Sequence, residues 1–73
     1  MDVDGSRMRE LRLAKMLTQQ ELATQSDTTE STVNRLENSL QRARISTVRK
    51  LAGALGVEPQ ALLRTTQSAQ DES

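Results

Sequence analysis

The chain has 73 residues, with ten basic and ten acidic side chains and a net charge of zero. A chain of this length forms one small domain, whose core contributes only about 3–5 kcal/mol to stability. It contains no Cys, no His and no aromatic residue. This composition excludes disulfides, thiolate nucleophiles, the commonest metal ligand and the aromatic stacking with which RNA and single-strand binders hold bases. We therefore expect no metal and no cofactor.

The charges are distributed unevenly along the chain. All ten Arg and Lys lie within residues 6–64, which contain only six acidic residues and therefore carry a net charge of +4. The longest apolar runs are two or three residues, too short for a membrane span or a signal peptide. We expect no membrane association, and the absence of Cys favours a reducing, cytoplasmic setting. A basic body fits nucleic-acid binding, although mixed charge is also ordinary on a soluble surface.

The chain begins with an acidic segment, residues 1–5, which we expect to be flexible. Ser6 can cap a first helix that runs to about Lys15. The spacing of the apolar residues places three of them on its buried side: Met8, Leu11 and Ala14. Its basic residues occupy the remaining face, where we expect Arg9 and Arg12 to be solvated. Met16 follows at a place where a helix end prefers Gly, so we expect some strain there.

Residues 18–38 have the pattern of two short helices joined by a tight turn. Thr18 and Glu21 have the spacing of a capping box, in which each side chain accepts a hydrogen bond from the other residue's backbone N–H. Thr29 is a good N-cap for the second helix. The turn between the two helices, residues 26–28, consists of residue types that tolerate turn geometry.

The second of these helices, residues 29–38, has an apolar and a polar side. Val33 and Leu36 share one face at helical spacing. The polar side chains on the other faces are Glu30, Ser31, Asn34, Arg35 and Asn38. A helix that is held from behind by apolar residues and presents donors and acceptors suits the major groove of double-stranded DNA. Arg35 is the side chain we expect to read sequence.

The rest of the chain is expected to support this pair. Residues 39–44 predict a loop in which Arg42 and Arg44 can bind phosphates, while Leu40 packs inward. Ser46 is the predicted cap of a fourth helix that ends at Gly56. Pro59 then opens a short fifth helix. The polar tail, residues 65–73, is expected to be disordered.

Taken together, the segments MRELRLAKMLTQQELA (8–23), STVNRLEN (31–38) and STVRKLAGALGVEPQALL (46–63) closely resemble the lambda-repressor-like helix-turn-helix family, also called the Cro-repressor or XRE type. The resemblance covers residues 6–64. It implies an all-α, compact five-helix DNA-binding domain, in which helices 2 and 3 form the helix-turn-helix.

The resemblance also implies roles for individual residues. In this family the third helix enters the major groove, and the start of the second meets the DNA backbone. Gln19 would then contact a phosphate or an adjacent base, as the free N–H groups of a helix start also favour, and Thr29 would contact a phosphate. The expected DNA-binding residues are Gln19, Thr29, Glu30, Ser31, Asn34, Arg35, Asn38, Arg42 and Arg44.

The sequence departs from the family in and around the turn. Three residues stand where the family usually has Gly: Met16, Asp27 and Ser39. Ser26 and Thr28 replace apolar residues, and a buried polar group without a partner costs about 1–3 kcal/mol. We therefore expect a looser turn or a lower stability. Asp27 and Glu30 also place negative charge close to the expected path of the phosphates.

Two functions remain open. The first is a sequence-specific double-stranded DNA-binding transcriptional regulator, which would bind a pseudo-palindromic operator as a homodimer. Family analogy offers Ala61 and Leu63 for the dimer contact. The alternative is a protein–protein interaction module, adaptor or antitoxin-like, which the zero net charge favours. An enzyme is not expected, because a site without His or Cys needs a carboxylate pair or an activated Ser or Lys, and no such set shares a helix face.

Overall fold

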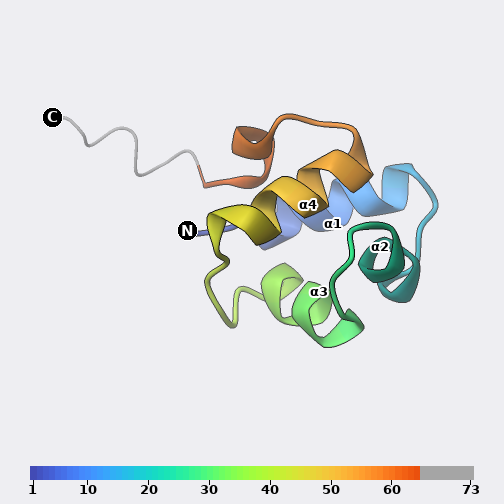
Figure 1. Cartoon of the computed structure of the whole chain (residues 1–73), viewed down its shortest axis with the longest axis horizontal. Coiled ribbons are helices and arrows are strands. Elements are labelled where there is room, and N and C mark those ends of the chain that lie inside the picture. Colours follow the sequence, from blue (N-terminus) through green and yellow to red (C-terminus); the bar gives the residue numbers. More distant parts are fainter. Residues whose placement is uncertain (65–73) are drawn as a thin grey trace, which may run out of the picture.

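The computed structural model describes residues 1–64, so the predicted disorder of residues 65–73 lies outside the described part. It has four α-helices and one 3₁₀ helix: α1 (Gly5–Ala14), α2 (Gln19–Gln25), α3 (Glu30–Glu37), α4 (Ile45–Leu55) and η1 (Pro59–Leu62) (Figure 1). The all-α prediction is confirmed, although the fifth helix is a single 3₁₀ segment. Within residues 1–64, no helix is long and apolar enough to cross a membrane.

The predicted signals at four helix ends are confirmed. Thr18 and Glu21 form the capping box of α2, with the Glu21 N–H donating to Thr18 at 3.0 Å and the Thr18 N–H donating to Glu21 at 2.8 Å. Thr29 caps α3 by accepting from the backbone N–H of Thr32. Gly56 ends α4 with a left-handed φ of 73°, and Pro59 is the first residue of η1. These caps are short-range contacts, which is why the sequence predicted them.

Two predicted helix starts are wrong. α1 begins at Gly5 and not after Ser6, because Asp4 is the N-cap and accepts from the backbone N–H of Arg7 at 3.1 Å. α4 begins at Ile45 without any side-chain cap, so Ser46 lies inside its first turn. In the first case a long-range contact decides the start: the N–H of Asp4 donates to the carbonyl of Leu62 at 2.7 Å, which holds the chain extended up to Asp4.

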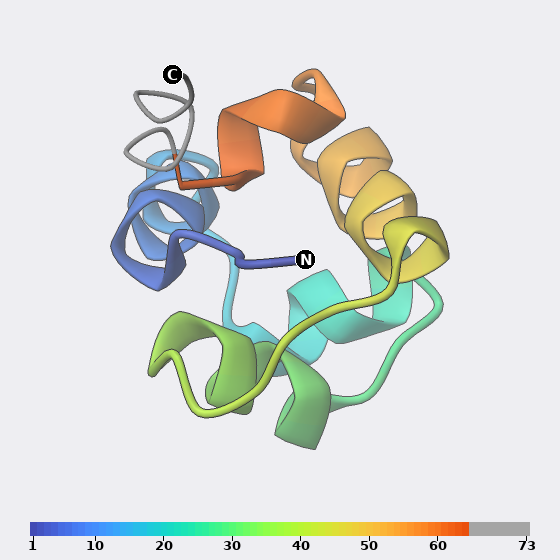
Figure 2. The same cartoon turned by 90° about the vertical axis from the view of Figure 1, so that its left-hand side faces the viewer.

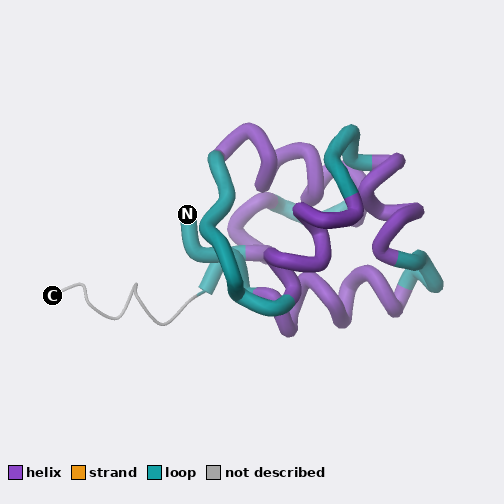
Figure 3. The backbone as a smooth tube through the Cα atoms, turned by 90° about the horizontal axis from the view of Figure 1, so that it is seen from below, coloured by secondary structure: helices purple, strands orange, loops and turns teal. Residues whose placement is uncertain are grey.

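The five helices surround one core (Figure 2), and the segment before α1 belongs to it. Val3 is only 4% exposed and forms an isolated β-bridge with Leu63. The N–H of Ala43 donates to the carbonyl of Met1 at 3.0 Å, so this segment also holds the loop after α3, which runs on the same side of the molecule (Figure 3). Residues 1–5, for which the sequence predicted flexibility, thus form defined contacts with the loop after α3 and with Leu63.

This placement changes the charge of the folded body. Residues 1–64 contain ten basic and eight acidic side chains, a net charge of +2, because Asp2 and Asp4 are part of the fold. The value of +4 for residues 6–64 therefore overstates the positive charge that a partner would meet.

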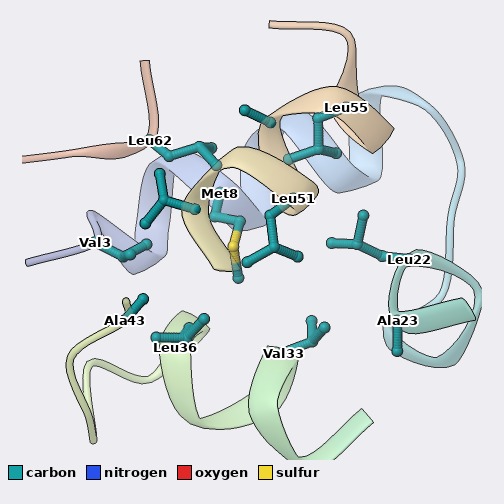
Figure 4. Close-up of a cluster of buried hydrophobic side chains, with 12 residues drawn as sticks. Val3, Met8, Leu22, Ala23, Val33, Leu36, Ala43, Leu51, Leu55 and Leu62 are labelled. Carbon is teal, nitrogen blue, oxygen red and sulfur yellow. The ribbon is translucent and has the colours of Figure 1, made fainter. Parts of the chain in front are cut away.

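Met8 lies at the centre of the apolar cluster, with side chains from every helix around it (Figure 4). The buried apolar residues are Val3, Met8, Leu22, Ala23, Val33, Leu36, Ala43, Val48, Leu51, Ala52, Leu55 and Leu62. Leu40, which was expected to pack inward, is 70% exposed. Ala43 takes the inward position of that loop because its pairing with Met1 draws it against the core. Ala14, expected on the buried side of the first helix, is exposed.

Three helices end in a left-handed residue that is not Gly. Met16, Asp27 and Ser39 have φ values of 59°, 57° and 57°. In each case the next N–H bonds back to a carbonyl five residues earlier, as in a Schellman motif: Leu17 to Arg12, Thr28 to Ala23 and Leu40 to Arg35. A side chain in this conformation costs about 1–2 kcal/mol. The strain expected at Met16 is thus present, and it recurs at two further helix ends.

Replacing Met16 by Gly tests this strain. Because Met16 is 89% exposed, little packing is lost, and we expect Met16→Gly to raise the free energy of unfolding by about 0.5–1 kcal/mol. Met16→Ala, which removes the same side chain but keeps a Cβ, should give no such gain. Urea unfolding followed by far-ultraviolet circular dichroism measures both. Equal stability of the two variants would contradict the strain.

Two glycines in helices should respond oppositely to Ala. A Cβ at Gly5 would lie 2.3 Å from the carbonyl oxygen of Glu37, so α1 must shift away from the end of α3. A Cβ at Gly53 would meet nothing within 4 Å. We expect Gly5→Ala to destabilise the fold by about 1–3 kcal/mol and Gly53→Ala to stabilise it by about 0.5–1 kcal/mol. Thermal unfolding of both variants measures the two changes in stability, which should have opposite signs.

Candidate nucleic-acid interface

The two-sided character predicted for the helix at residues 29–38 is present in the structure. Val33 and Leu36 are completely buried and hold α3 against the core. The exposed side chains of α3 and its C-cap are Glu30, Ser31, Asn34, Arg35 and Asn38. Thr29 and Asn38 also have local bonds: Thr29 caps the helix, and the Asn38 amide donates to the carbonyl of Asn34 at 2.9 Å.

The start of α2 meets this exposed face. Gln19, the first residue of α2, lines a shallow hollow together with four residues of α3: Glu30, Ser31, Asn34 and Arg35. Five of the nine predicted site residues are therefore brought together in one place. The lining offers amide, hydroxyl, carboxylate and guanidinium groups, which are the groups that read base edges and bind phosphates.

Behind this face lies a buried ion pair between Glu37 and Arg12, an arginine for which the sequence predicted a solvated position. The Arg12 side chain is only 9% exposed and that of Glu37 only 3%. The guanidinium binds the carboxylate at two points, with Nε–Oε2 at 2.6 Å and Nη2–Oε1 at 3.1 Å. Its remaining arm, Nη1, donates to the carbonyl of Leu17 at 2.7 Å. Arg12 therefore joins α1, the end of α3 and the residue that precedes the cap of α2.

The sequence contains a signal for this pair that the pattern of charges on the first helix does not reveal. Arg12 lies four residues after Met8, and Glu37 lies four residues after Val33, so each occupies a position on a buried stripe. Opposite charges on the apolar faces of two helices can be buried only together. The residue type alone does not distinguish Arg12, because the other arginines of α1 are exposed.

The buried carboxylate reaches the exposed face through Gln19. The Gln19 Nε2 group donates to Glu37 Oε1 at 3.1 Å, and Gln19 Oε1 accepts from Asn34 Nδ2 at 3.3 Å. The Gln19 amide, which we expected to contact a phosphate, is thus held in place by the buried Glu37 carboxylate. Gln19 belongs to α2, but its side-chain amide is held by two residues of α3, Glu37 and Asn34.

The buried polar side chain in the turn between α2 and α3 has hydrogen-bond partners, which the sequence did not predict. Ser26 is buried, but its hydroxyl donates to the carbonyl of Leu22 at 2.7 Å and lies 2.9 Å from the Thr28 hydroxyl. The penalty for an unpaired buried group therefore does not arise at Ser26. Asp27 Oδ2 lies 3.7 Å from the Lys50 ammonium, and because both side chains are exposed to solvent the pair contributes little to stability.

The two predicted phosphate-binding arginines lie in the loop after α3. Arg42 and Arg44 are both exposed. Arg42 Nε lies 3.2 Å from Asp2 Oδ1, so a carboxylate already occupies one side of this guanidinium. Arg64 donates to the hydroxyl of Ser39 at 2.8 Å, which adds a third basic side chain to the loop. Neither Asp2 nor Arg64 was expected to contact it, because both contacts join distant parts of the chain.

Replacing either partner of the buried pair should be severe. Arg12→Met or Glu37→Met leaves one buried charge uncompensated, which costs about 3–5 kcal/mol, as much as a domain of this size has in total. The double variant removes both charges, and we expect it to regain most of the lost stability. Urea unfolding measures the three variants.

Arg9→Met is the matched control for this series, because Arg9 is an exposed arginine of the same helix. Its effect should stay within about 0.5 kcal/mol. If Arg12→Met were as stable as Arg9→Met, the ion pair would not be the link that joins the helices.

Comparisons with known proteins identify the family and the fold. The family model described as helix-turn-helix matches residues 8–62. The restriction-modification controller protein C.AhdI from Aeromonas hydrophila is 41% identical over 81% of this chain and 86% of its own, with a TM-score of 0.77. A search of curated proteins finds no match.

Two further solved structures share the fold. The P22 c2 repressor, in complex with synthetic operator 9T, has a TM-score of 0.80 at 22% identity, over 88% of this chain and 97% of its own. A chain of the complex of SinR protein with SinI protein has a TM-score of 0.80 at 26% identity, over 94% of this chain and 68% of its own. The resemblance to lambda-repressor-like domains is thus confirmed.

Proposed function

Because the chain belongs to the XRE-type helix-turn-helix family of DNA-binding transcription regulators, we propose that it binds a specific double-stranded DNA sequence with α3 in the major groove. The observation that carries the proposal is the exposed polar face of α3, which the buried Val33 and Leu36 hold against the core. The family and the compared proteins are regulators and not enzymes, and the proposed activity is binding alone.

The contacts divide into those that position the protein and those that read sequence. Gln19, Thr29, Arg42 and Arg44 are placed around α3 and would bind phosphates, with the first N–H groups of α2 beside them. Asn34 and Arg35 lie in the middle of the exposed face and would meet base edges. Glu30 could accept from a cytosine amino group; opposite a phosphate it would repel.

Two copies on one operator would make up for the few contacts of a monomer. A two-fold symmetric pair places its recognition helices about one helical turn apart, which requires a pseudo-palindromic site. Leu63, a candidate from family analogy, is half-buried and bridged to Val3. Leu40 and Ile45, on either side of Ala43, are 70% and 54% exposed and therefore offer more apolar area for the homodimer contact.

A protein partner is the second candidate function, because exposed acidic groups at Asp27 and Glu30 oppose DNA and one similar chain occurs in the SinR–SinI complex. Titration with random duplex DNA at low salt, followed by backbone amide shifts, separates the two. Shifts confined to Gln19, α3 and residues 39–44 support DNA binding. An absence of shifts up to near-millimolar duplex would favour the protein-binding module.

Arginine substitutions test the division of roles after an operator has been selected from a random duplex library. Arg35→Ala should weaken operator binding by about 1–3 kcal/mol and relax the preference at one base pair per half-site. Arg42→Ala and Arg44→Ala should weaken binding to operator and random DNA alike. Each should also lower the salt dependence by about one phosphate contact.

Arg49→Ala is the charge-matched control, because Arg49 is an exposed arginine of α4 that does not line the hollow. Arg49→Ala should leave the preferred bases unchanged. It should lower the salt dependence by less than one phosphate contact. An equal loss on operator and random DNA for Arg35→Ala would remove Arg35 from the residues that read sequence. Fluorescence anisotropy at several salt concentrations measures all four variants.

A further inference from the structure

The starting point is that a carboxylate can only accept hydrogen bonds. Glu37 Oε1 accepts from Arg12 Nη2 and from Gln19 Nε2, each at 3.1 Å. Because the Glu37 side chain is 3% exposed and bound at both oxygens by Arg12, it cannot turn away. Of the two ends of the Gln19 amide, only the NH₂ end can face this carboxylate. Glu37 therefore fixes which way the Gln19 amide points.

The orientation of Gln19 then decides that of Asn34. With its NH₂ group toward Glu37, Gln19 presents its carbonyl oxygen to Asn34. That oxygen accepts from Asn34 Nδ2 at 3.3 Å. If the Asn34 amide were turned over, its carbonyl oxygen would lie against the Gln19 carbonyl oxygen, and two acceptors cannot form a hydrogen bond. Asn34, which is exposed, is thereby left with one N–H donor and its carbonyl oxygen for a ligand.

We propose that Gln19 is a positioning residue that makes Asn34 a reader of adenine. In the major groove adenine offers one acceptor, N7, beside one donor, the N6 amino group, and Asn binds this pair at two points. Guanine offers two acceptors there, which the single remaining N–H of Asn34 does not match. The inference rests on the proposed function and adds to it the identity of one base and the side chain that sets the preference.

A purely structural role for the same bonds makes a different prediction. If Gln19 only fastened α2 to α3, its loss would reduce stability and weaken binding to all sequences equally. A positioning role changes the preference at one base pair. The readout is therefore the relative affinity for the four bases at each operator position.

Gln19→Met is the test variant, because it keeps the length of the side chain and leaves the pair of Arg12 and Glu37 intact. The wild-type protein should select adenine at one position of each half-site, with a preference of about 5- to 150-fold. Asn34→Ala should abolish the preference at that position. Gln19→Met should reduce it to under about threefold there while other positions keep theirs. Gln20→Met, one residue along α2 and outside the hollow, should leave it unchanged.

The outcomes separate the inference from the function beneath it. If the wild-type protein selects no sequence at all, the proposed function fails. If it selects a sequence, but Gln19→Met keeps the preference that Asn34→Ala removes, Gln19 does not position Asn34 and the inference is overturned. An operator without an Asn34-dependent adenine overturns it as well.

The side-chain amide signals of Asn34 give a second measurement that needs no DNA. In the free protein, Gln19→Met should shift the Asn34 NH₂ resonances and bring the two protons closer in shift, because neither proton then has a fixed acceptor. Gln20→Met should leave them in place. Unchanged Asn34 signals in Gln19→Met would contradict the hydrogen bond on which the proposal depends. Thermal unfolding of each variant shows that the fold persists.

Discussion

The ion pair of Arg12 and Glu37 is the interaction on which the rest of the structure depends. It lies between α1 and α3, is almost completely buried, and binds the backbone just before α2 through the carbonyl of Leu17. Such pairs add little net stability compared with apolar side chains, because the desolvation of two charges offsets their attraction. Their effect is geometric. The guanidinium has one arrangement in which it donates to both Glu37 carboxylate oxygens and to the Leu17 carbonyl oxygen, and that arrangement sets the position of α3 relative to α2.

The same pair connects the core to the exposed face. Gln19 bonds to Glu37 below and to Asn34 above, so a buried charge orients amides that a ligand would meet. The Val33 and Leu36 side chains anchor α3 but place no constraint on which polar atom points outward. Apolar packing therefore decides where the face lies, and the polar network decides what it presents.

The overall charge suggests how binding energy would be divided. A net charge of +2 over residues 1–64, with Asp2 beside Arg42 and Glu30 on α3, gives weak attraction to phosphates. Under the proposed function, discrimination between sequences would then come mainly from a small number of groove contacts, and a second copy on the operator would become important. Three strained helix ends, at Met16, Asp27 and Ser39, also leave a domain of this size little spare stability.

Local signals in the sequence were sufficient for the caps at Thr18, Thr29 and Gly56 and for the apolar face of α3, because each depends on residues within one or two helical turns. The tertiary structure alone decided that Arg12 is buried against Glu37, that residues 1–4 are part of the fold and that Leu40 faces outward. These features depend on partners 25 or more residues away, such as Glu37 for Arg12 and Leu63 for Val3. A charge or an extended segment has no fixed environment until the fold brings its partner to it. The spacing of Arg12 after Met8 and of Glu37 after Val33 marks buried stripes, but only the tertiary structure shows that these two residues meet.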